Sequence, residues 1–323
     1  MTSVSTSGGR VPPGRRRPIP WFKYLAIAPL LLTFVALVAV PVGQLVWMSF
    51  GHVRMVAGDF QWAFAGLENF ERMLRDETFA ISLGNSAVFI FWTVLLTMVL
   101  GTVLALATDR LVRGQQFAQN LMIWPAIIAP VVISVVWLLI LSPQIGLLNR
   151  ILISIGIEPQ TWLGESFGAM ASVIILDTWH WTPIVFLFVY TAVRGIDSSV
   201  LEAARVDGAS YLRQVKDIIL PLVTPALIGA AAIRLIMGVK AFDEMYLLTF
   251  GGPGTATTVI TIYLRAVFFD SFEYGYGAAL SVTVVLLVLL IIIMTITPKR
   301  PTYQAGTRCC VARGVVGIAR LLA

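Results

Sequence analysis

The chain has 323 residues, of which 58% are hydrophobic and 12% are charged, whereas an average soluble domain has about a quarter charged residues. With a mean hydropathy of +0.87, this composition predicts a protein that crosses a membrane several times and excludes a soluble enzyme built around one core. The formal net charge of +6 is therefore interpreted by the position of the basic residues along the chain and not as a sign of nucleic-acid binding.

Residues 1–21 are rich in Ser, Gly, Pro and Arg and predict a disordered basic tail. Apolar runs long enough for a helix to cross roughly 30 Å of hydrocarbon then follow one another. We expect an all-α membrane protein with six transmembrane helices, at approximately 22–49, 85–108, 118–141, 169–193, 219–249 and 277–297. Residues 22–300 form the predicted transmembrane domain and 301–323 a C-terminal tail.

The basic residues predict the orientation of these helices. Most Lys and Arg residues fall on one side of the membrane if both termini lie in the cytoplasm, so the positive-inside rule favours cytoplasmic termini. The predicted outer loops are 50–84, 142–168 and 250–276. In the first of these, Leu67, Phe70 and Met73 recur at helical spacing and predict a short amphipathic helix at the outer interface.

Charged residues inside the fourth and fifth runs are candidates for a solute pathway, because each costs about 2.5–3.5 kcal/mol in the membrane and tends to face the interior. Asp177 and Lys240 lie at similar predicted depths. A pairing of Asp177 with Lys240, or one through Asp243, is therefore possible, either as a structural ion pair or as a solute contact. Arg234 is expected to pair with a neighbouring helix or with a partner subunit.

Aromatic residues surround Asp177 in the fourth run. Trp179 and Trp181 offer flat rings of the kind that stack on the apolar faces of sugars, but their spacing of two residues points them to different sides of a helix. At most one of them is expected to line the shared solute cavity. His180 is interpreted either as a satisfied core histidine or as a ligand. Pro183 is expected to kink this helix and free a backbone carbonyl.

The segment 198–225 between the fourth and fifth runs has its own design. Good helix formers lead to Gly208, which can adopt the positive φ of a tight turn, and apolar residues at helical spacing follow it. The pattern predicts a helix, a turn and a second helix. On composition alone, an ordinary polar loop is an equally good interpretation.

The order of residues in this segment resembles the EAA loop of the permeases of binding-protein-dependent ABC importers. That pattern is Glu-Ala-Ala, then Gly after three more residues, then Ile/Leu-x-Leu-Pro-x-x-x-Pro. The matching positions are Glu202, Ala203, Ala204, Asp207, Gly208, Ala209, Ile218, Leu220, Pro221 and Pro225. The resemblance covers roughly 22–300 and is strongest to the carbohydrate-uptake branch, whereas the tail after Pro301 departs from the short ending of the family.

The resemblance implies the fold of a type I ABC importer permease in the bacterial inner membrane. It also implies a multi-pass subunit that moves a sugar or sugar-like solute and works with a second, different permease, two ATPase subunits and an extracytoplasmic solute-binding protein. The coupling residues, which would dock on the ATPase, are Glu202, Ala203, Ala204, Asp207, Gly208 and Ala209. The residues assigned to the solute pathway are Asp177, Trp179, His180, Lys240, Asp243 and Tyr246.

No motif for catalysis is found in the chain. Its Gly-rich run, Gly251–Gly254, lacks the Lys-Ser/Thr of a phosphate-binding loop and lies in a predicted outer loop. We therefore expect a transport subunit without enzyme activity, cofactor or metal, with ATP and magnesium bound by the partner ATPase. The alternative is an ion-coupled secondary transporter with ion sites at Asp177, His180 and Asp243. That class predicts inverted repeats, and none is evident in the sequence.

Overall fold

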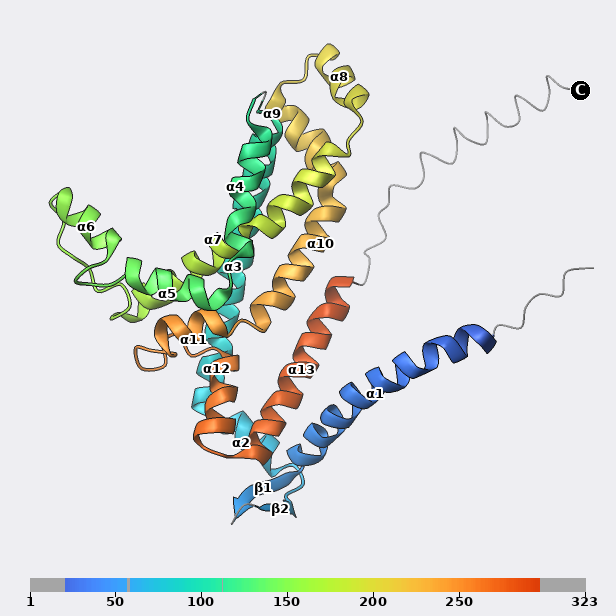
Figure 1. The fold of residues 1–323 in the computed structure, drawn as a ribbon, viewed down its shortest axis with the longest axis vertical. Coiled ribbons are helices and arrows are strands. Elements are labelled where there is room, and N and C mark those ends of the chain that lie inside the picture. The colour runs from blue at the N-terminus through green and yellow to red at the C-terminus, as the bar shows by residue number, and fades with distance from the viewer. Residues whose placement is uncertain (1–20, 57–58, 112, 297–323) are drawn as a thin grey trace, which may run out of the picture.

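A computed structural model of the chain describes residues 21–56, 59–111 and 113–296. These residues form a bundle of helices with one small hairpin (Figure 1). The predicted tail 301–323 lies outside the described residues, as does the predicted tail 1–21 apart from Trp21. Both tails stay predictions.

In the part of the chain that the structure describes, four helices are long and apolar enough to cross a membrane. A fifth is added if α4 and α5 count as one span, and α13 carries a shorter apolar stretch, Tyr274–Leu290. The prediction of several apolar spans is thus confirmed, whereas the number six and the side on which the termini lie stay predictions. The four spans lie in α1 (Trp21–Ser49), α3 (Glu77–Asp109), α7 (Ser166–Arg194) and α9 to α10 (Tyr211–Val239), and α13 as a whole runs over Tyr274–Ile296.

The third predicted span is not one straight helix. It consists of α4 (Gln115–Ile127) and α5 (Pro130–Ile140), which are bent by 96° at the residues between them. Ile128 and Ala129 have extended backbone, and Pro130 disfavours a helical conformation at the residue before it. The expectation of a continuous helix over 118–141 was wrong for this reason.

The fifth predicted span is broken as well. A π-helical turn, η1 (Val215–Ile219), joins α9 (Tyr211–Gln214) to α10 (Leu220–Val239) without interruption, but α10 ends at Val239 and α11 (Asp243–Thr249) follows after a gap. The hydroxyl of Thr261 donates a hydrogen bond of 2.6 Å to the carbonyl of Ala241 in this gap. Irregular backbone inside a membrane protein needs such partners, because no water is there to replace them.

Helix α7 lies at the centre of the fold and packs along α3. Gly101 of α3 permits their close approach, since a Cβ at this position would lie 2.7 Å from Cβ of Val185 and 3.0 Å from the backbone nitrogen of Phe186. Apolar residues of α7, α3 and α10 form one buried cluster here, which includes Ala105 and Val223. Pro183, expected to kink α7, is buried within a helix that continues through it.

The end of the molecule farthest from α9 carries an antiparallel hairpin of β1 (Gly51–Val56) and β2 (Asp59–Phe64), which was not predicted from the sequence. The expected amphipathic helix next to it is confirmed as α2 (Glu68–Arg75). Asn69 holds α2 to the chain before it by donating to the carbonyls of Ser49 and Gly51, at 3.0 and 3.1 Å. The remaining elements are α6 (Leu147–Ser154), α8 (Ser198–Val206), α12 (Ile260–Arg265) and η2 (Ala266–Asp270).

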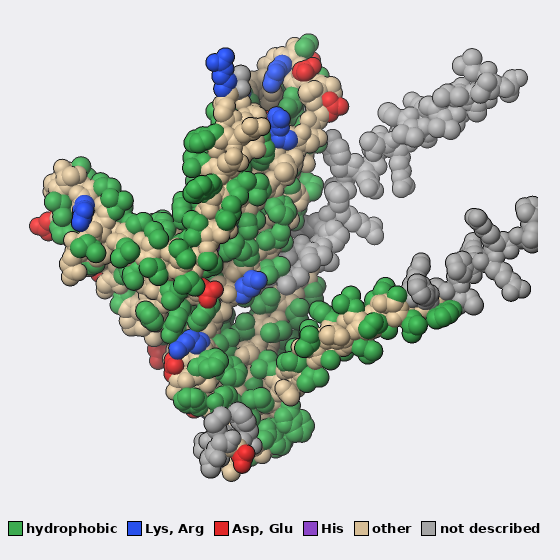
Figure 2. Space-filling view, viewed as in Figure 1, with side chains coloured by type: hydrophobic (Ala, Val, Ile, Leu, Met, Phe, Trp, Pro, Cys, Tyr) green, Lys and Arg blue, Asp and Glu red, His purple; other side chains and the backbone are tan. Residues whose placement is uncertain are grey.

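The hairpin and α2 lie at one end of the long axis, and α8 and α9 lie at the other (Figure 1). Helix α1 leaves the bundle at the hairpin end and is not buried by the rest of the chain. On the face shown in Figure 2, charged side chains of both signs gather around α8 and α9, while apolar side chains cover the long helices below them. The surface is therefore suited to lipid or to another subunit along its length and to water or protein at the end formed by α8 and α9.

Candidate functional site

A buried ion pair joins α7 to α10. Arg234 donates from Nη2 to Oδ2 of Asp177, and its Nε lies 3.4 Å from Oγ1 of Thr97 on α3. Asp177 and Arg234 are 1% and 0% exposed. This contact corrects the expectation that Asp177 pairs with Lys240 or through Asp243, and it shows that the partner of Arg234 lies on a neighbouring helix of the same chain.

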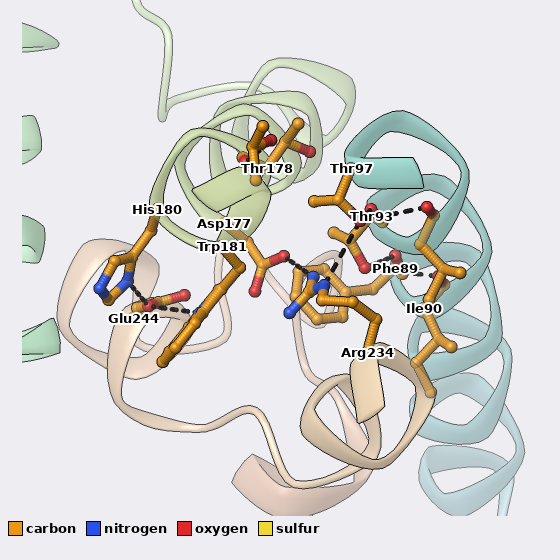
Figure 3. A network of polar contacts seen from close by, with 12 residues as sticks. Phe89, Ile90, Thr93, Thr97, Asp177, Thr178, His180, Trp181, Arg234 and Glu244 are labelled. Atoms are coloured by element: carbon orange, nitrogen blue, oxygen red, sulfur yellow. Dashed lines mark hydrogen bonds and ion pairs between the residues drawn. The ribbon is translucent and has the colours of Figure 1, made fainter. Parts of the chain in front are cut away.

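A second polar pair joins α7 to α11 on the other side of the break. Nδ1 of His180 contacts Oε1 of Glu244, and Nε1 of Trp181 donates to the same oxygen at 3.1 Å. The rings of His180 and Trp181 are stacked, with centroids 4.3 Å apart. His180 is fully buried, so its environment matches the interpretation as a core histidine with a satisfied Nδ1. Figure 3 shows Asp177 and Trp181 extending from α7 toward the residues of α10 and α11.

A cavity of about 310 Å³ lies where these helices meet the break in the fifth span. Lys240 and Asp243 belong to its wall and are exposed, whereas Asp177 and Glu244 reach it from the buried pairs. The cavity thus combines three carboxylates, one ammonium group and an indole ring. Its lining residues are Pro130, Asp177, Trp181, Met237, Lys240, Ala241, Phe242, Asp243 and Glu244.

The two tryptophans of α7 face different spaces, as their spacing predicted. Trp179 is 44% exposed and lines a larger, mainly apolar cavity of about 660 Å³ between α3, α4 and α7, where its ring lies 6.1 Å from that of Trp137. Tyr246 lies on α11 against Phe242, with ring centroids 5.0 Å apart. The structure therefore places Asp177, Lys240 and Asp243 around one cavity, whereas the other predicted pathway residues, Trp179, His180 and Tyr246, are not in its wall.

Three buried polar atoms of this region have no hydrogen-bond partner among the described residues. They are Oγ1 of Thr178, Nε2 of His180 and Nη1 of Arg234. A buried donor or acceptor without a partner costs about 1–3 kcal/mol. We call the buried polar side chains of this region the polar layer, which comprises Asp177, Thr178, His180, Trp181, Arg234 and Glu244. Its three unpartnered atoms can form further hydrogen bonds with water, solute or another subunit, with Arg234 as a donor.

Glu244 lines this cavity but is not among the pathway residues predicted from the sequence. Its carboxylate binds two α7 side chains and lines the cavity. The available signal was the acidic pair Asp243–Glu244 within an apolar run, but residue types alone do not distinguish the second residue from the first. The break at 240–242 decides this, because it starts a new helix in which Asp243 is exposed and Glu244 is buried.

The predicted helix-turn-helix is confirmed at the end opposite the hairpin. Asp197 caps α8 by accepting a hydrogen bond of 3.0 Å from the backbone N–H of Ser199. Gly208 then adopts φ +78°, a conformation that residues with a Cβ rarely adopt. The N–H of Ala209 donates to the carbonyl of Ala204 at 2.9 Å and closes the turn. We call residues 195–210, between α7 and α9, the elbow.

Most of the predicted coupling residues are on the surface of the elbow. Glu202, Ala203, Asp207 and Gly208 are exposed, Ala209 is half-buried and Ala204 is buried. Two apolar side chains near the turn have no cover from this chain: Val206 is 88% exposed and Leu212 is 78% exposed. Exposed apolar side chains beside charged ones are typical of surfaces that bind another protein.

A bundle of apolar helices that holds a polar cavity at a broken span, and that presents an exposed elbow at one end, is typical of the membrane subunit of a transporter. Residues 88–300 match the family model described as "Binding-protein-dependent transport system inner membrane component", and the chain belongs to this family. It is therefore a permease subunit of an ABC importer, which decides against the ion-coupled alternative.

Related chains and structures agree with this assignment. The chain is 34% identical over 259 residues to the trehalose/maltose transport system permease protein MalF of Thermococcus litoralis, covering 80% of this chain and 87% of that protein. It is 32% identical over 260 residues to the sn-glycerol-3-phosphate transport system permease protein UgpA of Agrobacterium fabrum, covering 80% and 88%. A bacterial ABC transporter involved in the import of the acidic polysaccharide alginate contains a chain of the same fold, with a TM-score of 0.76, 22% identity and coverage of 85% and 94%.

Proposed function

We propose that this chain forms part of the membrane pathway of an ATP-driven importer for an uncharged sugar. It works with a second, different permease, two ATPase subunits that bind ATP and magnesium, and an extracytoplasmic solute-binding protein. The chain has no enzyme activity of its own, crosses the inner membrane six times and keeps both termini in the cytoplasm. The exposed elbow is the observation that carries the proposal, because it is the surface through which a separate ATPase can move the membrane helices.

The elbow is built to be covered by another protein. Its turn projects at the end of the bundle (Figure 1), and Val206 and Leu212 leave apolar surface in water that a partner groove would bury. A Cβ at Gly208 would meet nothing of this chain within 4 Å. Since the chain itself leaves room at Gly208, we propose that the space is needed for close approach of the ATPase.

The solute site is proposed at the cavity between α7, α10 and α11. Trp181 supplies an aromatic face, and Asp243, Glu244 and Lys240 supply acceptors and a donor for hydroxyl groups. Relatives of the chain transport sugars and also a phosphate ester. The cavity favours the sugars, because Arg234 is already paired with Asp177 and Lys240 shares the cavity wall with three carboxylates. Asp177, Trp179, His180, Lys240, Asp243 and Tyr246 are proposed as the pathway residues, with Glu244 and Trp181 added from the geometry.

Transport then follows from coupling the two sites. The binding protein delivers solute to an outward-facing cavity, ATP binding closes the ATPase pair, and the elbow carries that closure to the helices on which it sits. The break in the fifth span allows α10 and α11 to move separately while each stays attached to α7. Two arrangements of these helices would expose the cavity to one side of the membrane at a time.

The test replaces Gly208 by Val in the complete importer, purified from its own cells and reconstituted in proteoliposomes. Val at φ +78° costs roughly 1–2 kcal/mol of backbone strain, which leaves the bundle folded, but it fills the space reserved for the ATPase. We expect the amount of solute taken up per ATP hydrolysed to fall by roughly tenfold or more, corresponding to about 1.4 kcal/mol of coupling free energy.

Gly156→Val is the matched control. Gly156 has φ +82° and equally open surroundings, but it follows α6, far along the chain from the elbow. Its replacement imposes a comparable backbone strain and is expected to leave the uptake per ATP within about twofold of the wild type. Equal coupling in the Gly208→Val and wild-type importers would contradict the proposal, as would a purified transporter that contains no ATPase subunit.

The solute class is tested in the same proteoliposomes by adding competitors to the uptake of a labelled disaccharide. Maltose and trehalose are the neutral competitors, and sn-glycerol 3-phosphate is the anionic one. We expect inhibition by a neutral sugar and none by the phosphate ester. Preferential uptake of the phosphate ester would contradict the assignment of an uncharged solute and leave the coupling role of the elbow intact.

A further inference from the structure

The inner end of α3 contacts the chain on both sides of the elbow. Asp109 is the last residue of α3, and its Oδ1 lies 3.7 Å from Nη1 of Arg194, the last residue of α7 before the elbow. Arg110, which caps α3, stacks on Tyr211, the first residue of α9 after the elbow, with the guanidinium carbon 3.1 Å from the ring centroid. Asp109 and Arg110, neighbours at the end of α3, thus contact the residue before the elbow and the residue after it, which we call the two feet of the elbow.

The end of α3 attracts positive charge. Asp109 and the last carbonyl groups of the helix both carry negative charge there, so the nearby guanidinium groups of Arg194 and Arg110 are favoured. The side chain of Gln115 also donates to the carbonyl of Asp109 at 3.1 Å. The end of α3 is therefore held by Gln115 and contacts both feet of the elbow.

The elbow between these feet is internally tied. The N–H of Ala209 bonds to Ala204, and the side chain of Gln214 donates to the carbonyl of Ala209 at 2.8 Å. Ile196 and Leu201 pack against the buried cluster that contains Ala105 of α3. Because the turn is closed by its own hydrogen bonds, a displacement of the turn would also move the flanking residues Arg194 and Tyr211, which contact the end of α3.

Helix α3 connects the elbow with the polar layer of the cavity. Gly101 lets α3 approach α7 closely, because a Cβ at this position would lie 2.7 Å from Cβ of Val185. Thr97 of the same helix meets Arg234, the partner of Asp177. Arg110 is 13 residues from Thr97 in the sequence, which is roughly 20 Å along a helix.

We propose that Arg110 and Tyr211 are positioning residues that make α3 the helix through which the ATPase movement reaches the solute cavity, with Asp109 and Arg194 as the second contact. This inference rests on the proposed function of the elbow. It assigns to the ring of Tyr211, and not to its hydroxyl, the contact that carries the movement. A guanidinium group is attracted to the face of an aromatic ring, and this attraction is stronger where water is excluded.

The experiment compares Tyr211→Phe with Tyr211→Leu in the complete reconstituted importer. The labelled disaccharide serves as the probe, and uptake per ATP hydrolysed is the measured quantity. Phe keeps the ring, so we expect coupling within about twofold of the wild type, whereas Leu removes the stack and is expected to lower it roughly fivefold. Arg110→Gln should match Tyr211→Leu. The ATPase should co-purify with all of these variants, because the docking surface on the turn is unchanged.

The control is Arg72→Gln. Arg72 also stacks on a ring, with its guanidinium carbon 4.2 Å from the centroid of Tyr276, but it lies at the hairpin end of the molecule. We expect this change to leave the uptake per ATP unaltered. An effect equal to that of Arg110→Gln would overturn the inference, because loss of any ring contact would then disturb transport.

Other outcomes separate this inference from the function on which it rests. Full coupling in Tyr211→Leu would overturn the role of the stack, and so would a Tyr211→Phe importer as impaired as Tyr211→Leu. Loss of the ATPase from the purified Tyr211→Leu complex would also overturn it, since the stack would then serve assembly. Failure of the proposed function has a different signature: the wild-type importer itself would lack ATP-driven uptake.

Discussion

The polar layer inside the bundle and the elbow at its end differ in what covers their side chains. In the polar layer, each charged side chain is covered and bound to a neighbour of the same chain, as Asp177 is to Arg234. In the elbow, the backbone is closed by its own hydrogen bonds, while the side chains of Val206 and of Leu212, which follows the elbow on α9, remain exposed. The contrast separates buried charges that are paired within the chain from apolar side chains that are left for another protein to cover.

The largest effect is expected from breaking the polar layer at Arg234. Arg234→Met leaves Asp177 buried without its cation, and removal of one partner from a buried ion pair costs about 3–5 kcal/mol. We expect a large fall in the thermal unfolding temperature of the purified importer and a low yield of the complex. Thermal unfolding in detergent, with the yield measured by gel filtration, checks the prediction.

The double variant Asp177→Leu, Arg234→Met is the comparison. Replacing both charges by apolar side chains removes the unpaired carboxylate and is expected to recover most of the lost stability. Uptake should not recover with it if Asp177 belongs to the solute pathway. A single variant as stable as the wild type would show that the two side chains are not paired in the membrane.

A smaller effect is expected at the second pair of the polar layer. Glu244→Gln keeps an acceptor for Trp181 but loses the charged partner of His180, and hydrogen bonds to charged groups contribute about 1.5–3 kcal/mol. The unfolding free energies of Glu244→Gln, His180→Gln and the double variant form a cycle. We expect a coupling free energy of about 0.5–3 kcal/mol between the two residues. Additive effects would mean that His180 and Glu244 do not act together.

The elbow could be predicted from the sequence because its information is local. Gly208, the helix formers before it and the apolar spacing after it lie within one short segment, so the turn follows from residue types alone. The pairing within the polar layer depends on how the helices pack. Asp177 and Arg234 are 57 residues apart on different helices. Lys240 was considered as the partner of Asp177 because a similar predicted depth in the membrane can be estimated from the sequence, whereas helix packing cannot.

The breaks in the third and fifth spans were missed for a related reason. Hydropathy measures how apolar a run is and does not report its direction, so α4 and α5 were predicted as one span. The signal for the first break was Pro130, which restricts the residue before it. The second break lies beside Lys240 and Asp243, charges that a continuous lipid-facing helix would not tolerate. Rotation of each helix about its axis, which decides that Glu244 and not Asp243 is buried, needs the neighbouring helices.

The smallest effect is expected at Asp76, at the hairpin end. Like the charges of the polar layer, its carboxylate is hydrogen-bonded within the chain, but it is only partly buried. Asp76 caps α3 by accepting from the N–H groups of Thr78 and Phe79, at 2.9 and 3.2 Å, and also accepts from the hydroxyls of Tyr263 and Tyr276. Partial burial works against its charge, but these four hydrogen bonds outweigh it and lower the pKa of Asp76 below 3.8. The carboxylate is thus ionised at neutral pH.

Asp76→Ala is expected to lower the stability by about 1 kcal/mol, the usual effect of losing a helix cap, which is below that of either buried pair because water can replace the lost partners. The folded pKa lies below the unfolded value of 3.8, so the stabilisation is complete above that pH and is lost as the pH falls through the folded pKa. The difference in unfolding free energy between wild type and variant should therefore be constant from about pH 5 to 8 and shrink only in stronger acid. A difference that shrinks between pH 5 and 7 would show that Asp76 lacks these hydrogen bonds, and a loss as large as that of Arg234→Met would show that this end is as dry as the polar layer.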